Sequence, residues 1–238
     1  MAKDYGIEIK TIDTPTLLKR NGYTVSAKPV TDEMLKEYVP LFEKEWSRYP
    51  RSLMARTKLA RIVLGADVRV LDQPRAAVPE FVQCWLWLDT DIGSTNKPYG
   101  KHVLHHDFFH MIDEHDTENH CLDPEWTALN KPGVKYGKGG WFMQTANAGV
   151  LRTDLPGFLN EYSTSGVEED KAEVYTYLLT NPAFMVDRVK ADSILAAKVA
   201  RLKALVVAFE PSMNSEWFTR NAVPVGKDTW TMHPSDGL

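Results

Sequence analysis

The stretch that decides the fold is His102-Val-Leu-His-His-Asp-Phe-Phe-His-Met-Ile-Asp-Glu-His115. Its apolar residues recur at helical spacing, whereas a strand would need strict alternation: Leu104, Phe108, Met111 and Ile112. With 3.6 residues per turn, the opposite side of that helix carries ring nitrogens and a carboxylate: His102, His106, His110 and Asp113. The stretch therefore predicts a helix with one packing face and one face suited to binding a metal ion.

His106 and His110 are one helical turn apart, so both rings can reach a single ion, and Asp107 lies between them. This is the spacing of the His-Glu-x-x-His helix, in which two imidazoles bind zinc and the carboxylate acts on water, although the carboxylate here is Asp. Asp113 is placed to accept a hydrogen bond from the distal nitrogen of a ligating ring. A pair of ordinary surface histidines is the alternative, and a third ligand would decide between the two.

The composition is that of an ordinary globular protein, with 238 residues, 43% hydrophobic and 25% charged. This length favours a single domain over residues 1–238. A net charge of −4 and a pI near 6.0 argue against nucleic acid as a partner, and no apolar run is long enough for a membrane span. We expect a cytoplasmic protein, or a secreted one from which a leader has been removed.

The two cysteines can form at most one disulfide bond. Cys84 lies in an apolar run and is expected to be a small buried hydrophobic residue. Cys121 follows the histidine cluster and could ligate a metal, although no second cysteine lies nearby.

Residues 1–60 form the N-terminal segment, which we expect to be mainly helical. A short strand is predicted within Gly6–Ile12. Thr31 is placed to cap a helix that runs to Trp46, and a second helix is predicted from Ser52 to Leu59.

Residues 61–180 form the expected core of the metal site. Its predicted strands are rich in β-branched and aromatic residues: Ile62–Leu64, Val68–Leu71 and Phe81–Asp89. Residues 89–100 read as a loop, and residues 116–146 as a long ordered connection. In that connection Trp126 and Trp141 are candidates both for core anchors and for substrate contacts.

A second helix is predicted after a capping box at Ser165–Glu168, and it ends at Asn181-Pro182. Glu169 and Glu173 lie one turn apart on it. Tyr162 precedes Glu169 by seven residues, from where its hydroxyl could stabilise an oxyanion beside a metal. Residues 181–238 are expected to be helical.

These residues together resemble the lethal-factor-type zinc metallopeptidases, a gluzincin-like group. That family has His-Glu-x-x-His followed by Asp, and then a Tyr seven residues before a ligand Glu that opens a Glu-x-x-Ala-Glu pattern. In this chain the first part matches at 106–113 and the second at 162–173. The connection from Asp123 to Gly140 is also similar, and the resemblance covers roughly residues 80 to 180.

The resemblance implies a role for each matching residue. Three stand at the positions of the ligands of one zinc ion: His106, His110 and Glu169. Two stand at the positions of the general base and of the tyrosine that assists the oxyanion: Asp107 and Tyr162. Two stand at the positions of carboxylates that support the ligands: Asp113 and Glu173.

The resemblance thus implies a zinc-dependent hydrolase that acts on a peptide or a small amide-containing substrate. The departure is Asp107, because a carboxylate misplaced by about 1 Å can lower the rate on the order of 10²-fold. A diverged relative with another metal-assisted reaction on a small molecule or modified amino acid stays open. So does a non-catalytic, metal-stabilised binding protein.

A mononuclear iron oxygenase is a rival from another class. His105 and Asp107 form His-x-Asp, and His233 could complete a triad of two histidines and one carboxylate. That triad usually lies on β structure, which conflicts with the helical period of this stretch.

The expected fold is α+β. A small mixed sheet would be packed by the active-site helix and the second ligand-bearing helix, between mainly helical N-terminal and C-terminal segments.

Overall fold

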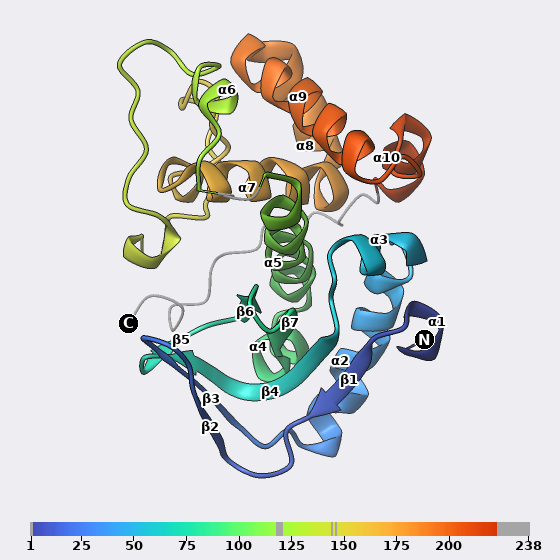
Figure 1. Ribbon diagram of the computed structural model, residues 1–238. Helices are drawn as coiled ribbons and strands as arrows, with labels where there is room; N and C mark the ends of the chain where they lie inside the picture. Colours follow the sequence, from blue (N-terminus) through green and yellow to red (C-terminus); the bar gives the residue numbers. More distant parts are fainter. Residues whose placement is uncertain (1, 118–120, 144, 146, 223–238) are drawn as a thin grey trace. The chain divides into compact units, whose positions relative to one another are not determined.

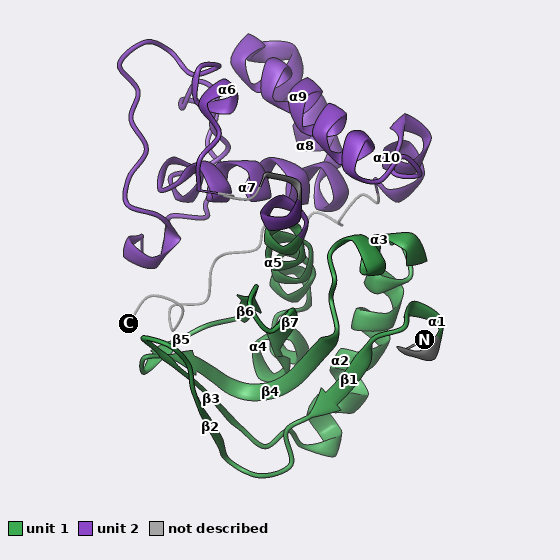
Figure 2. Cartoon of the chain, in the orientation of Figure 1, with its two compact units in different colours: residues 1–111, 234–238 green, residues 112–233 purple. Residues whose placement is uncertain are grey.

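The computed structural model describes residues 2–117, 121–143, 145 and 147–222 (Figure 1). The chain divides into two compact units, one up to Met111 and the other from Ile112 (Figure 2). A mixed seven-stranded sheet lies in the first unit, and helices dominate the second, so the predicted α+β class is confirmed. The expectation of a single domain stays a prediction.

The sheet of the first unit is built around its long strand, β4 (Arg61–Val70). Two strands pair in parallel with its first half: β1 (Glu8–Thr11) and β7 (Trp85–Asp89). Two pair antiparallel with its second half: β3 (Thr24–Lys28) and β5 (Gln73–Pro74). The remaining two pair antiparallel with β3 and β7: β2 (Thr16–Lys19) and β6 (Ala77–Glu80). Figure 1 shows β4 as a long, curved strand.

The two runs predicted separately form one strand, β4, with Gly65 in its middle. A Cβ atom there would lie 2.8 Å from the Cβ of Ala27 on β3, so only glycine allows the two strands to approach this closely. The short strand predicted within Gly6–Ile12 is confirmed as β1, whereas β2 and β3 were not predicted.

Two predictions next to β7 are wrong. Residues 81–84 form a turn instead of extending the strand, because Cys84 adopts a positive φ of 55°. The Cys84 side chain, which was expected to be buried, is half-buried. The predicted loop after Asp89 contains helix α4 (Thr90–Thr95), since the Asp89 carboxylate accepts hydrogen bonds from the backbone N–H groups of Asp91 and Ile92.

The helices of the first unit are α1 (Ala2–Tyr5), α2 (Asp32–Trp46), α3 (Arg51–Arg56), α4 and the beginning of α5 (Lys97–Thr117). Thr31 caps α2 as predicted, accepting a hydrogen bond from the Met34 N–H. The rings of Trp46 and Tyr49 each lie 4.7 Å from the ring of Phe108, which packs α2 and its end against α5. Phe108 belongs to the apolar face from which this helix was predicted.

The helices of the second unit are α6 (Pro124–Thr127), η1 (Gly140–Phe142), η2 (Tyr162–Thr164), α7 (Val167–Thr180), α8 (Pro182–Ala191), α9 (Ser193–Phe209) and α10 (Ser215–Asn221). The capping box at Ser165 is wrong, because Gly166 is the N-cap of α7 and the Ser165 hydroxyl donates to the Tyr162 carbonyl oxygen. The predicted stop is confirmed, since Asn181 ends α7 and caps α8. None of the helices in the described residues is both long and apolar enough to cross a membrane.

Candidate metal site

Helix α5 carries three buried histidines one turn apart, namely His102, His106 and His110. The Nε2 atoms of His106 and His110 are 3.2 Å from each other. Ligands of a tetrahedral zinc ion with Zn–N bonds of 2.0–2.1 Å are about 3.3 Å apart. The two rings are therefore already arranged as a pair of ligands to one ion.

Asp107 lies on α5 between these two histidines and is half-buried. Burial raises the pKa of the fully buried Tyr38, and the negative charges of Asp89 and Asp107 raise it further. The carboxylate of Asp107 is thus held within the first unit, close enough to act electrostatically on a buried phenol.

His105 has a structural role that the sequence analysis did not find. Its Nδ1 lies 2.6 Å from the Tyr49 hydroxyl, and its Nε2 lies 3.2 Å from Glu45 and 3.1 Å from Arg48. Burial lowers the pKa of His105 to about 4, so the ring is neutral near pH 7, accepting from Tyr49 and donating to Glu45. This network ties α5 to the end of α2, and the next residue, His106, points about 100° away around the helix.

In the second unit, Glu169 and Tyr162 meet at Gly140. A Cβ atom built on Gly140 would lie 2.2 Å from the Glu169 Oε1 atom and 2.3 Å from the Tyr162 hydroxyl oxygen. Both polar groups therefore lie against the same Cα atom, and only glycine leaves room for them. The structure brings together the carboxylate and the phenol that the sequence analysis linked by their spacing.

Glu173 lies one turn after Glu169 on α7 and is buried. Its carboxylate accepts a hydrogen bond from the Asn160 side chain, whose oxygen in turn accepts from the Ser163 N–H at 2.8 Å. Asn160 was not found from the sequence. It fixes the Glu173 carboxylate relative to the turn that carries Tyr162.

Asp113 forms a buried ion pair with Lys171, whose Nζ lies 2.7 Å from its carboxylate oxygens. Lys171 lies on α7 between the two glutamates and was not predicted to be buried. The hydrogen bond expected between Asp113 and a ligating histidine stays a prediction.

Asp170 anchors the long connection to α7 and α9. Its Oδ2 atom accepts hydrogen bonds from Trp126 at 2.8 Å, from Tyr136 at 2.6 Å and from Lys198 at 2.6 Å. Trp126 is therefore a core anchor, whereas Trp141 is partly exposed. Burial raises the pKa of Asp170, and the adjacent ammonium group of Lys198 opposes that shift.

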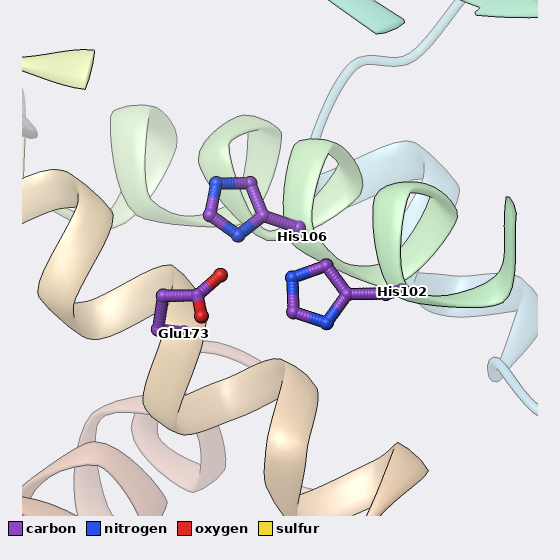
Figure 3. A group of neighbouring side chains, drawn as sticks. All are labelled: His102, His106 and Glu173. Atoms are coloured by element: carbon purple, nitrogen blue, oxygen red, sulfur yellow. The ribbon is translucent and has the colours of Figure 1, made fainter. Parts of the chain in front are cut away.

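Two groups of three buried side chains in the described residues have the types that could hold a metal ion. One group consists of His106, His110 and Glu169. The other, drawn in Figure 3, consists of His102, His106 and Glu173. Each combines imidazole nitrogen with carboxylate oxygen, which is a donor set that zinc accepts.

The remaining candidate ligands do not join these groups. Cys121 belongs to neither group; the residue is exposed overall, and partial burial of its thiol together with nearby acidic side chains raises the pKa of that thiol to about 11. His120 and His233 lie outside the described residues. His105 and Asp107 lie on helix α5, whereas the triad of the oxygenase alternative usually lies on β structure.

No protein-family model and no curated protein matches the chain. Among solved structures, a putative zinc-binding metallo-peptidase from Bacteroides caccae is similar, with a TM-score of 0.57 and 16% sequence identity. The similarity covers 93% of this chain and 87% of that one. At this identity it shows a shared fold.

Proposed function

We propose that the chain is a zinc-dependent hydrolase of the metallopeptidase type, with His106, His110 and Glu169 as the metal ligands. The observation that carries the proposal is the 3.2 Å separation of the two buried Nε2 atoms on α5. The meeting of Glu169 and Tyr162 at Gly140 supports it from the second unit. The similar fold of the Bacteroides caccae protein, which is described as zinc-binding, adds support.

Each residue of the proposed site has a chemical task. A zinc ion supplies Lewis acidity when bound, which polarises a carbonyl group and lowers the pKa of water toward about 7. Asp107 accepts the proton of the attacking water and passes it to the leaving amine. The Tyr162 hydroxyl donates a hydrogen bond to the oxyanion that forms as the amide carbonyl is attacked. The substrate is a peptide or a small amide-containing molecule.

Asp113 and Glu173 keep the ligands in place. The Asp113–Lys171 ion pair and the Asn160–Glu173 hydrogen bond fix both carboxylates within the second unit. Carboxylates placed in this way orient ligating side chains and set their tautomers.

Metal content, measured by elemental analysis of protein purified without added metal, tests the ligand set. We expect about one zinc per chain in the wild type and loss of it in His110→Ala and Glu169→Ala. His102→Ala is the matched control on the same helix and is expected to keep its zinc. Loss in His102→Ala with retention in His110→Ala would instead assign the metal to the group shown in Figure 3. Iron in place of zinc would favour the oxygenase, and absence of metal from the wild type would refute the proposal.

Asp107→Glu tests whether the short carboxylate limits the reaction. The added methylene moves the carboxylate about 1 Å toward the water, so kcat/KM on a peptide library should rise on the order of 10²-fold at unchanged zinc content. Asp107→Asn, which cannot accept the proton, should be inactive. Equal activity in all three proteins would rule out Asp107 as the general base.

A further inference from the structure

The 3-10 turn η1 (Gly140–Phe142) begins at the proposed site. Its first residue, Gly140, is buried, and its Cα atom lies against the Glu169 carboxylate and the Tyr162 hydroxyl. Trp141 and Phe142 follow directly. Consecutive Cα atoms are about 3.8 Å apart, so the Cα atoms of Trp141 and Phe142 lie at most about 8 Å from the Cα atom of Gly140.

Backbone hydrogen bonds hold the turn in place. The N–H groups of Gly137 and Gly139 donate to the carbonyl oxygens of Thr164 and Ser165, at 3.0 and 2.7 Å. Gly139 has a φ of 95°, which an L side chain rarely adopts, and the Phe142 N–H donates back to its carbonyl oxygen at 3.1 Å. The turn is therefore fixed to η2, the element that carries Tyr162.

The two aromatic side chains of this fixed turn are exposed. Phe142 is 68% exposed and Trp141 is 38% exposed. Among the other tryptophans in the described residues, Trp85 is half-buried and four are at most 3% exposed: Trp46, Trp87, Trp126 and Trp217. An apolar surface beside a few well-placed polar groups is typical of sites that bind small molecules or peptides.

We propose that Trp141 and Phe142 bind a large apolar side chain of the substrate, on a residue that flanks the cleaved amide bond. The inference rests on the proposed function and names its substrate class, a peptide with an aromatic or long aliphatic residue next to that bond. Residues of an extended peptide are about 3.3–3.6 Å apart, and a 3-10 turn rises about 2.0 Å per residue, so the Cα atoms of Trp141 and Phe142 lie within about two peptide residues of Gly140. A side chain beside an amide held at Glu169 and Tyr162 is therefore within reach of both rings.

The size of the selectivity follows from the area that the rings would bury. Burying a Phe or Leu side chain is worth about 1.5–3 kcal/mol, which corresponds to roughly a 10-fold to 100-fold preference over Ala. Lys138 contributes a positive charge 5.9 Å from the Phe142 ring. A peptide with an acidic residue at the same position is expected to bind less tightly than the Phe peptide, because a carboxylate would have to lose bound water to pack against the two rings.

The test uses blocked peptides that differ in a single residue beside the candidate bond, with Phe, Leu, Ala or Asp there. Their affinity for the zinc-loaded Asp107→Asn protein is measured by calorimetry, and their cleavage by the wild type is followed separately. We expect the Phe and Leu peptides to bind at least 10-fold more tightly than the Ala peptide. Phe142→Ser and Trp141→Ser, added to this background, should reduce that preference to less than about 3-fold at unchanged zinc content.

The matched control is Val186→Ser, which changes an exposed apolar residue on α8 in the same unit and should keep the preference. Equal affinity for the Phe and Ala peptides, or a preference that persists in both turn variants, would overturn the inference. A change in oligomeric state without a change in peptide preference would also overturn it and assign the rings to self-association. Selective binding that both turn variants abolish, without cleavage by the wild type, would keep Trp141 and Phe142 as the residues that bind the apolar side chain of a peptide and would refute the proposed hydrolysis.

Discussion

The ion pair between Lys198 and Asp170 gives the sharpest prediction about stability. Both side chains are fully buried, and the Lys198 ammonium lies 2.6 Å from the Asp170 carboxylate and 2.7 Å from the Gly157 carbonyl oxygen. Lys198→Met would leave the carboxylate buried without its opposite charge. Breaking a buried pair in this way costs about 3–5 kcal/mol. At about 2–4 °C per kcal/mol for a chain of this size, Tm should fall by about 6–20 °C.

Urea unfolding followed by circular dichroism, together with scanning calorimetry, measures this loss. Lys203→Met is the control on the same helix, where a half-buried lysine lies 5.2 Å from the Phe218 ring, and it should change the free energy of unfolding by less than about 1 kcal/mol. Asp170→Asn combined with Lys198→Met removes both charges and keeps an oxygen for Trp126 and Tyr136, so it should be more stable than Lys198→Met alone. The reasoning is refuted if Lys198→Met is as stable as the control.

Two further changes test contacts in the first unit. His105 has a pKa of about 4 when folded and about 6.5 when unfolded, so its stabilising effect is present above pH 6.5 and is lost as the pH falls toward 4. Between pH 7 and pH 4.5, with metal chelated, the free energy of unfolding of the wild type should fall by about 2–3 kcal/mol more than that of His105→Gln. Urea titrations at the two pH values measure both losses, and equal losses in the two proteins would contradict the neutral His105 ring. Gly93→Ala would place a Cβ atom 2.2 Å from the Tyr38 ring and should cost about 1–3 kcal/mol, whereas Ser94→Ala, at a half-buried position of the same helix, should cost less than about 0.5 kcal/mol. Thermal unfolding compares the two, and equal Tm values would show that the ring moves aside freely.

The sequence predicted best where one physical signal dominates. The stripe from Leu104 to Ile112 predicted α5, and Thr31 predicted the start of α2, because a 3.6-residue period and a capping side chain are local features. Asn181 predicted the end of α7 for the same reason.

Prediction failed where the deciding partner lies far along the chain or in the backbone. The strands β2 and β3 are only four and five residues long, and β3 is a strand because it pairs with β4. The positive φ of Cys84 shortens β7, although nothing in an apolar run indicates it. Helix α4 was not predicted, because its segment is rich in residues that favour turns. Its N-cap, Asp89, is held by a residue 21 positions earlier in the chain, since its carboxylate also accepts a hydrogen bond from the Val68 N–H.

For the candidate site, the sequence indicated residue types and spacing but not the partners that hold them. His106 and His110 could be paired from their spacing alone. The sequence could not indicate the roles of three other residues: Lys171, Asn160 and Gly140. A buried lysine, a hydrogen-bonding amide and a missing Cβ atom can be recognised as important only when their neighbours in the structure are known. The glycine-rich composition of the connection was the one available signal for Gly140.

The position of β4 in the chain has a consequence for how the protein is made. Strand β1 pairs with it at Glu8 and Arg61, so 53 residues of synthesis separate the two partners, which takes about 3–10 s at about 5–20 residues per second. Until β4 emerges, the earlier strands expose unpaired edges that other nascent chains could join. Each of these strands carries one lysine, Lys10, Lys19 or Lys28. Charged side chains on exposed edges oppose pairing between chains, so we expect these lysines to disfavour aggregation of the growing polypeptide until its own sheet can close.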